Sequence, residues 1–298
     1  MNISDRVTVL NKGKLTGTVI TKESSEEELA SLMIGEKVSL KYEYVKAKLS
    51  SHPLLSVKNL NHVNKAGQKT ISNLSFELYG GEILGVAGIV GSGQKELCEI
   101  LTGLQAASGS ANFNGDELLR MNPREIKKLG IRMNFVPEAR LGMGLVAGMG
   151  VSDNVILRNY NETKGLFIDK RNAEEKAREI IKRYEISTPG IHNAVRMLSG
   201  GNIQKVLLAR EIEMNPKFLI VSYPFRGLDI GATNNIIATL NVQKAKGVGI
   251  LLIAEDLDQL MGISDRIMVL HNGENMGIVN PRETTKEKLG LMMMGENK

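Results

Sequence analysis

The sequence predicts an α/β fold with an antiparallel β subdomain and a helical subdomain. Three continuous apolar runs, each followed by a helical stretch, are typical of buried parallel strands: "GEILGVAGI", "KFLIVSY" and "GILLIAE". Segments rich in β-formers near Gly and Asn turns predict antiparallel strands: "LLSVKNL", "SNLSFELY" and "SANFNG". Helical patterns dominate residues 139–215, which we expect to form the helical subdomain.

The first residues of the chain repeat a segment near its end. "ISDRVTVLNKGKLTGTV" from Ile3 aligns without a gap with "ISDRIMVLHNGENMGIV" from Ile263, and residues 3–37 share fifteen identities with this second segment. Self-similarity at a long fixed offset indicates duplication. We therefore expect residues 1–37 to be the tail of a preceding domain copy and 38–53 to be a linker. A complete copy then spans 54–280, and 281–298 form a C-terminal tail helix.

The composition of the chain excludes several classes of protein and kinds of site. The 298 residues contain 38 Lys and Arg against 33 Asp and Glu, a net charge of +5, and no block of like charge that would predict a nucleic-acid stripe. The single cysteine, Cys98, lies in an apolar pattern and excludes an internal disulfide. The four histidines lack ligand spacing, so we expect no metal site made by them. No segment suits a membrane span or a signal peptide, so we expect a cytoplasmic protein.

A glycine-rich loop predicts an anion site. In "GIVGSGQKEL" a buried strand leads through a glycine turn into a helix, which points backbone N–H groups at an anion. Glycines without a Cβ let such a backbone close on phosphate. The expected nucleotide-binding residues are Gly88, Gly91, Ser92, Gly93, Gln94, Lys95 and Glu96.

Two positions of this loop depart from the usual phosphate loop. Such a loop carries a Lys that reaches the terminal phosphates, followed by a hydroxyl residue that binds Mg²⁺, whereas this chain has Gln94 and Lys95 there. Lys95 is no substitute, because neighbouring helical positions point about 100° apart. Taken alone, the loop leaves two readings open, a phosphate cradle or a glycine turn without a ligand.

A second glycine pair opens another helix in "LSGGNIQKVLLAREI", and "PKFLIVSYPFRGLDIGA" follows it. An N-cap role would explain Ser199 but not its neighbours in that order. Together with the loop, this ordered set resembles the ATP-binding-cassette (ABC) family of nucleotide-binding domains. The resemblance covers residues 54–298, and residues 1–37 match the end of a preceding cassette. In such a pair the signature elements act on the partner's ATP site; here they are Leu198, Ser199, Gly200, Gly201, Asn202, Gln204 and Asp229.

The wording of the motifs looks most like the second cassette of fused double ATPases in simple-sugar and purine-nucleoside importers, with a slight lean to the nucleoside branch. The resemblance implies a P-loop NTPase core of the ABC type that uses ATP and Mg²⁺. It implies three kinds of partner: a preceding cassette, transmembrane permease subunits contacted through residues 136–153, and indirectly a substrate-binding protein. It places the chain at the inner face of the membrane, bound through the permease, and implies no nucleic acid.

The same resemblance marks positions where catalysis is lost. The family's Asp-Glu pair is replaced by Ser222 and Tyr223, its phosphate-contacting His by Glu255, and its Q-loop Gln by Glu138. A Ser carries no charge, and a Tyr with an ordinary pKa near 10 is a poor base at neutral pH. We expect Mg²⁺ binding in the chain's own site to be weak or absent and hydrolysis to be negligible. His62 is the only candidate for stacking on adenine.

Two hypotheses remain open. In the first, the chain is half of a transport ATPase and supplies its signature helix to the partner's ATP site. The alternative is a non-hydrolysing module that senses nucleotide or scaffolds the complex. A cassette acting on nucleic acid or ribosomes is disfavoured by the missing basic stripe and the tandem arrangement.

Overall fold

The computed structural model describes residues 3–11, 13–34, 42–135, 144–157 and 170–296. The described elements, in chain order, are β1 (Arg6–Asn11), β2 (Lys14–Ile20), η1 (Thr21–Glu23), α1 (Glu26–Ile34), β3 (Pro53–Val63), β4 (Lys69–Tyr79), β5 (Ile83–Gly88), α2 (Gln94–Leu101), β6 (Ser108–Phe113), β7 (Asp116–Glu117), η2 (Leu118–Arg120), α3 (Pro123–Lys128), β8 (Ile131–Phe135), α4 (Val151–Ile156), α5 (Lys170–Arg183), η3 (Val195–Met197), α6 (Gly200–Ile212), β9 (Phe218–Ser222), α7 (Ile230–Ala245), β10 (Gly249–Ile253), α8 (Leu257–Ile263), β11 (Arg266–His271), β12 (Glu274–Val279) and α9 (Lys286–Met293).

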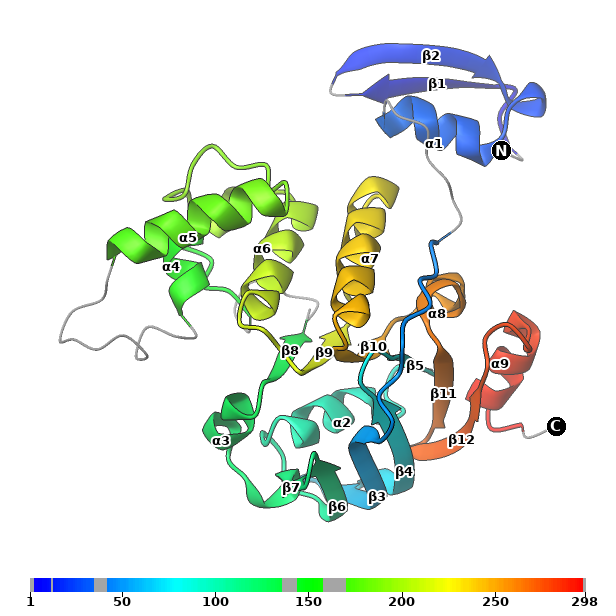
Figure 1. Ribbon diagram of the computed structural model, residues 1–298. Coiled ribbons are helices and arrows are strands. Elements are labelled where there is room, and N and C mark those ends of the chain that lie inside the picture. The colour runs from blue at the N-terminus through cyan, green and yellow to red at the C-terminus, as the bar shows by residue number, and fades with distance from the viewer. Residues whose placement is uncertain (1–2, 12, 35–41, 136–143, 158–169, 297–298) are drawn as a thin grey trace.

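The main sheet has the strand order β12-β11-β5-β10-β9-β8 (Figure 1). The five strands from β11 to β8 run parallel to their neighbours, and β12 pairs antiparallel with β11 at the edge. The three apolar runs are β5, β9 and β10 at the centre of this sheet, and β9 and β10 are buried along their whole length. The predicted α/β core is therefore confirmed.

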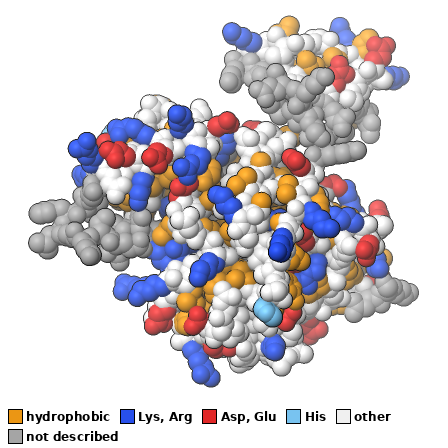
Figure 2. Space-filling view, viewed as in Figure 1, with side chains coloured by type: hydrophobic (Ala, Val, Ile, Leu, Met, Phe, Trp, Pro, Cys, Tyr) orange, Lys and Arg blue, Asp and Glu red, His pale blue; other side chains and the backbone are white. Residues whose placement is uncertain are grey.

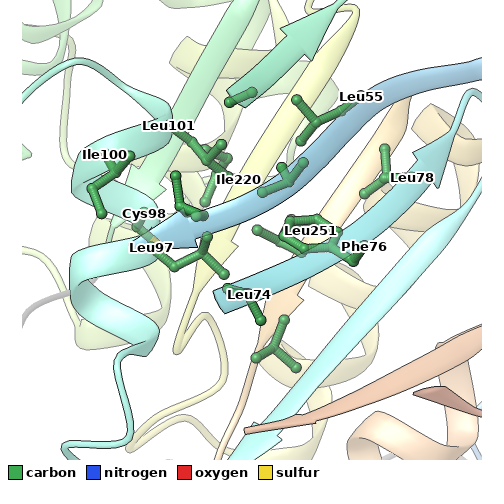
Figure 3. Close-up of a cluster of buried hydrophobic side chains, with 14 of the residues drawn as sticks. Leu55, Leu74, Phe76, Leu78, Leu97, Cys98, Ile100, Leu101, Ile220 and Leu251 are labelled. Carbon is green, nitrogen blue, oxygen red and sulfur yellow. The ribbon is translucent and has the colours of Figure 1, made fainter. Parts of the chain in front are cut away.

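A second sheet, antiparallel and ordered β4-β3-β6-β7, covers helix α2. Figure 3 shows Leu97, Cys98 and Leu101 of α2 among side chains of both sheets, including Leu55 of β3 and Ile220 of β9. Cys98 is 1% exposed, as expected of a core residue. Because α2 begins at the glycine loop, this packing fixes the loop between the two sheets.

Helices α4, α5 and α6 share a hydrophobic cluster of their own. The charge-rich helix α5 buries Ala173, Ala177 and Ile180 on one face, and its charged side chains, such as the Arg178–Glu174 pair at 3.3 Å, lie on the other. Helix α5 is therefore an amphipathic surface helix.

The unit of β1, β2 and α1 has the same pairing as β11, β12 and α9. Val9 pairs with Gly17, and 260 residues later Val269 pairs with Gly277. Both hairpins shift register at the next position. The surroundings differ, because β11 also pairs with β5, whereas β1 pairs only with β2 among the described strands. As a result Leu10 of β1 is 64% exposed, whereas its counterpart in β11 is buried.

Pro53, the last residue of the expected linker, is the first residue of β3. No described helix is both long and apolar enough to span a bilayer. On the face seen in Figure 2, Lys and Arg side chains are interspersed with acidic ones and do not gather into one stripe.

Candidate functional site

The candidate site lies at the carboxyl edge of the main sheet. Parallel strands β5, β10 and β9 end there side by side, since Ile253 pairs with Val86 on one side and with Ser222 on the other. The segments that follow these strands carry the glycine loop and positions 222–229 and 255. Loops at this edge are the usual place for ligands in open α/β sheets.

The glycine loop closes tightly between β5 and α2. Gly91 has φ +94° and Gly93 has φ +98°, a left-handed conformation that favours glycine. A Cβ on Gly93 would lie 2.6 Å from the carbonyl oxygen of Thr70, and one on Gly88 would lie 2.8 Å from that of Leu270. The conformation of the loop therefore requires glycine at these positions. The backbone N–H groups at the end of the loop lie at the N-terminus of the eight-residue helix α2.

Gln94 is turned into the loop. Its side chain is 3% exposed, and its Nε2 donates to the carbonyl oxygen of Ile89 at 3.0 Å. The Gln94 amide therefore stabilises the conformation of the loop through a hydrogen bond inside it. Lys95 points away, with a side chain 61% exposed and its Nζ 3.9 Å from Glu99 Oε1 one helical turn along. The Lys95 ammonium group is therefore directed along α2 and out to solvent.

The end of β9 carries no acidic pair. Ser222 is 2% exposed, and Tyr223 has φ +51°, which is uncommon for a residue with a bulky side chain. The Tyr223 N–H donates to the carbonyl oxygen of Ile253 at 2.8 Å, and its ring packs against the cluster around α2. Burial raises the pKa of the Tyr223 hydroxyl above its ordinary value, assisted by Cys98 and Glu255. The hydroxyl therefore remains protonated at neutral pH and is a poor general base.

Glu255 faces a cation at the site. Its Oε1 lies 3.9 Å from Arg226 Nη1, and both side chains are almost half exposed. Arg226 was not among the residues predicted for the site, although it lies in "PKFLIVSYPFRGLDIGA". The only earlier signal was a basic residue just before "GLD". This pairing moderates the repulsion expected between Glu255 and a phosphate.

Mg²⁺ does not fit the described residues of this site. Proteins usually hold Mg²⁺ through one or two carboxylates together with substrate phosphates and waters in octahedral geometry. The loop offers Lys95 where a hydroxyl would bind, and β9 ends in a neutral Ser222. Among the described residues, no group of three or more His, Cys, Asp or Glu side chains could hold a metal ion. The groups of this loop that could contact an anion are its backbone N–H groups.

The second glycine pair lies at the start of α6. Ser199 caps this helix: its Oγ accepts from the Asn202 N–H at 3.4 Å and from Asn202 Nδ2 at 2.8 Å. A Cβ on Gly201 would lie 3.1 Å from the Cβ of Ala232, so the starts of α6 and α7 touch. Asp229 caps α7 and accepts from Ala232 N–H at 2.7 Å. The structure thus brings the expected signature residues and Asp229 together.

The expected signature residues differ in how far their side chains are exposed to solvent. Ser199 is exposed and Gly200 and Gly201 are partly so, whereas Leu198 and Gln204 are buried at 8% and 1%. The buried members hold α6 in the helical subdomain. The exposed members leave the positive end of a thirteen-residue helix open to an external anion.

Two further expectations can be compared with the structure. His62 is buried, and its Nδ1 is hydrogen-bonded to the carbonyl oxygen of Ala106 at 2.7 Å, so its ring has no free face for adenine. Glu138 lies outside the described residues, as does most of the segment expected to contact a permease.

A cavity of about 560 Å³ lies at the carboxyl ends of α5, α6 and α7, between Tyr184 and Lys246, away from the glycine loop.

Comparison with known proteins gives close relatives. A family model described as ABC transporter matches residues 71–225. The nucleoside import ATP-binding protein NupA of Lactococcus lactis is 38% identical over 99% of this chain and 58% of the relative. The guanosine import ATP-binding protein NupO of Bacillus subtilis is 38% identical over 98% and 58%. The ribose import ATP-binding protein RbsA of Clostridium tetani is 37% identical over 96% and 56%.

The chain therefore spans less than two thirds of the length of these curated relatives. Among solved structures, a nucleotide-free ATP-binding cassette from an ABC transporter superposes with a TM-score of 0.68. It is 23% identical and covers 82% of this chain and 96% of that structure. This likeness shows the fold.

Proposed function

The chain belongs to the ABC transporter family, and from this premise we propose that it is the second cassette of a fused ATPase that drives import of nucleosides or simple sugars. In this proposal it supplies its signature helix α6 to the ATP site of the preceding cassette. Its own site keeps a backbone cradle and does not hydrolyse ATP.

One observation carries the proposal. The side chains that would handle phosphate and metal in the chain's own site are replaced or turned away, while the capped, exposed start of α6 is intact. Phosphoryl transfer depends on positioning and charge neutralisation. A cassette whose own site lacks these groups, but whose helix α6 has an exposed N-terminus, is suited to donate binding groups to the ATP site of a partner.

The duplicated unit supports a preceding cassette. Arg266 at the start of β11 binds the buried Glu82, which precedes β5, whereas its counterpart Arg6 is exposed. The free edge of β1 would suit a parallel strand equivalent to β5, the strand that covers the same edge of β11. The relatives' greater length leaves room for such a preceding domain.

The remaining partners follow from the same proposal. The relatives are import ATP-binding proteins by name, and we propose that this chain acts at the inner face of the membrane through permease subunits. The second hypothesis, a nucleotide-sensing or scaffolding module, assigns no role to the exposed start of α6.

Replacing Gln94 with Lys is expected to strengthen ATP binding about tenfold without creating turnover. The Gln94 amide is occupied by Ile89, whereas an ammonium group in the loop would make charge-assisted hydrogen bonds to phosphate. Calorimetric titration with ATP, with and without Mg²⁺, checks this. We expect similar affinities for the unmodified chain in both conditions.

Lys95→Gln is the matched control, because its exposed ammonium points along α2, and we expect affinity to change by less than about twofold. Strong Mg²⁺ dependence in the unmodified chain would contradict the assignment of a metal-poor site. An unchanged affinity in Gln94→Lys would contradict the assignment of the loop as an anion cradle.

A further inference from the structure

The segment 42–52, named here the strap, lies along the cassette beside α7 and α8 (Figure 1). At its start, the Glu43 carbonyl oxygen accepts from Asn241 Nδ2 of α7 at 2.7 Å. A Cβ on Gly262 of α8 would lie 2.7 Å from the Cβ of Tyr42, so glycine permits this close approach. The strap is thus fitted to two helices of the cassette.

The other end of the strap is held by backbone contacts. The Ser50 N–H donates to the Gly80 carbonyl oxygen, and the Gly80 N–H donates to Ser50 Oγ, both at 2.9 Å. A Cβ on Gly81 would lie 2.6 Å from the carbonyl oxygen of Lys48. Reciprocal hydrogen bonds and this close approach fix the strap just before β3.

Tyr44 lies between these two ends in a cluster of charges. Its hydroxyl donates to Asp265 Oδ1 at 2.8 Å. Two cations contact its ring, Lys244 with Nζ 4.3 Å from the ring centroid and Arg282 with Cζ 3.5 Å from it. Such contacts are attractive because a cation interacts with the electron-rich face of the ring.

The Tyr44 side chain covers part of this charged cluster. Lys244 is fully buried, and its Nζ donates to Asp265 Oδ1 at 2.8 Å. Burial lowers the pKa of Lys244, opposed by its hydrogen bond to Asp265. Asp265 Oδ2 accepts from the Ile83 N–H at the start of β5. Removing the Tyr44 side chain would take away its hydrogen bond to Asp265 and its ring contacts with Lys244 and Arg282, so it would loosen the strap from this cluster.

We propose that the strap is an ordered tether, fixed by Tyr44 to the carboxyl-terminal half of α7, that holds the preceding half of the protein close to this cassette. The tethering role rests on the proposed function, because it requires a preceding half. The attachment of the strap to α7 and α8 stands on this chain alone. Tyr44 acts as a positioning residue.

The maximum extension of the chain limits how far the α1 unit can lie from the cassette. Eight residue steps separate the end of α1 at Ile34 from Tyr42, and nineteen separate it from Pro53. At about 3.5 Å per residue, the α1 unit can lie at most roughly 28 Å from the bound strap, but roughly 66 Å from β3 if the strap is released. Effective concentration falls roughly as the −3/2 power of tether length, so the effective concentration of the preceding half at this cassette falls about fourfold when the strap is released.

Limited trypsin digestion of the full chain tests the attachment. Cleavage after Lys46 and Lys48 requires the strap to open, and we expect Tyr44→Ala to accelerate it about tenfold. Tyr44→Phe keeps the ring and is expected to give a smaller increase. Glu43→Ala is the matched control, since Asn241 binds its backbone oxygen and not its exposed side chain. Equal cleavage rates in all variants would overturn the proposal.

Spin labels give a second readout that does not depend on protease access. With Lys46→Cys and Lys246→Cys labelled, the distance distribution is expected to be narrow in the parent and broad with Tyr44→Ala. The native Cys98 is buried and does not compete for label. Narrow distributions in both would refute the role of Tyr44.

A third measurement separates this proposal from the proposed function. In the tandem protein, a label pair on the preceding half and Lys246→Cys is expected to spread when Tyr44 is replaced. An unchanged distribution there, with a released strap, would overturn the tethering role. If the protein has no preceding cassette, the proposed function fails, while the digestion experiment still decides the attachment.

Discussion

Replacing Ser199 with Arg in the tandem protein is expected to lower steady-state ATP turnover by at least about 100-fold. Ser199 caps α6 and lies exposed at the positive end of that helix. We place the partner's terminal phosphate there, where preorganised donors stabilise the charge of the transition state. Removal of one such donor typically costs 100- to 1,000-fold in other enzymes, and an Arg side chain would also obstruct the approach. Phosphate release from Mg-ATP measures the effect.

Two controls separate this role from helix capping. Ser199→Ala removes the cap without adding bulk, and we expect it to cost about 1 kcal/mol of stability and to retain more turnover than Ser199→Arg. Thr285 caps α9 through the same kind of bond, accepting from the Lys288 N–H at 3.3 Å, so Thr285→Arg tests a cap outside the proposed site. Undiminished turnover in Ser199→Arg would refute the donor role and favour the scaffolding hypothesis.

Replacing Arg266 with Ala is expected to lower the free energy of unfolding of the cassette by about 3 kcal/mol. Glu82 is buried, accepts from Arg266 Nε at 2.6 Å and Nη2 at 3.1 Å, and also accepts from the Tyr79 N–H. Removing one partner of a buried ion pair leaves the other charge uncompensated, which typically costs 3–5 kcal/mol. The lower end applies because Arg266 is 34% exposed. Urea denaturation measures the change.

The duplicated position provides the matched control. Arg6 has the same place in β1 as Arg266 in β11 but is exposed, so Arg6→Ala is expected to leave the stability of this chain within about 0.5 kcal/mol. In the tandem protein the same substitution should destabilise the preceding cassette, because a buried Glu would lose its partner there. Equal effects of both substitutions in this chain would contradict the account of Glu82, and no effect of Arg6→Ala in the tandem would contradict the preceding cassette.

The sequence predicted the centre of the fold because strands buried on both faces are continuously apolar. Strands β5, β9 and β10 follow this rule. Strand β8 was missed because "IRMNF" is only five residues long and alternates apolar and polar residues, so it lacks the continuous apolar run that marked the other three. Arg132 is nevertheless buried, and its Nη1 donates to the carbonyl oxygen of Ile131.

Within the site, local helix geometry was predictable and tertiary contacts were not. The outward direction of Lys95 follows from the helical repeat. The inward bond of Gln94 depends on the loop conformation, and the Arg226–Glu255 pair joins segments that follow different strands. Tyr44 gave no signal either, because its partners lie about 200 residues later in the chain.

The most direct test of the account is ATP hydrolysis by the purified chain alone. Phosphate release from Mg-ATP is measured across protein concentrations, with Tyr223→Phe alongside. We expect release at the rate of the protein-free blank for both proteins, because Ser222 and the protonated Tyr223 provide neither a carboxylate for the metal nor a base. Steady turnover by the unmodified chain that Tyr223→Phe abolishes would show that its own site is catalytic and would contradict the account.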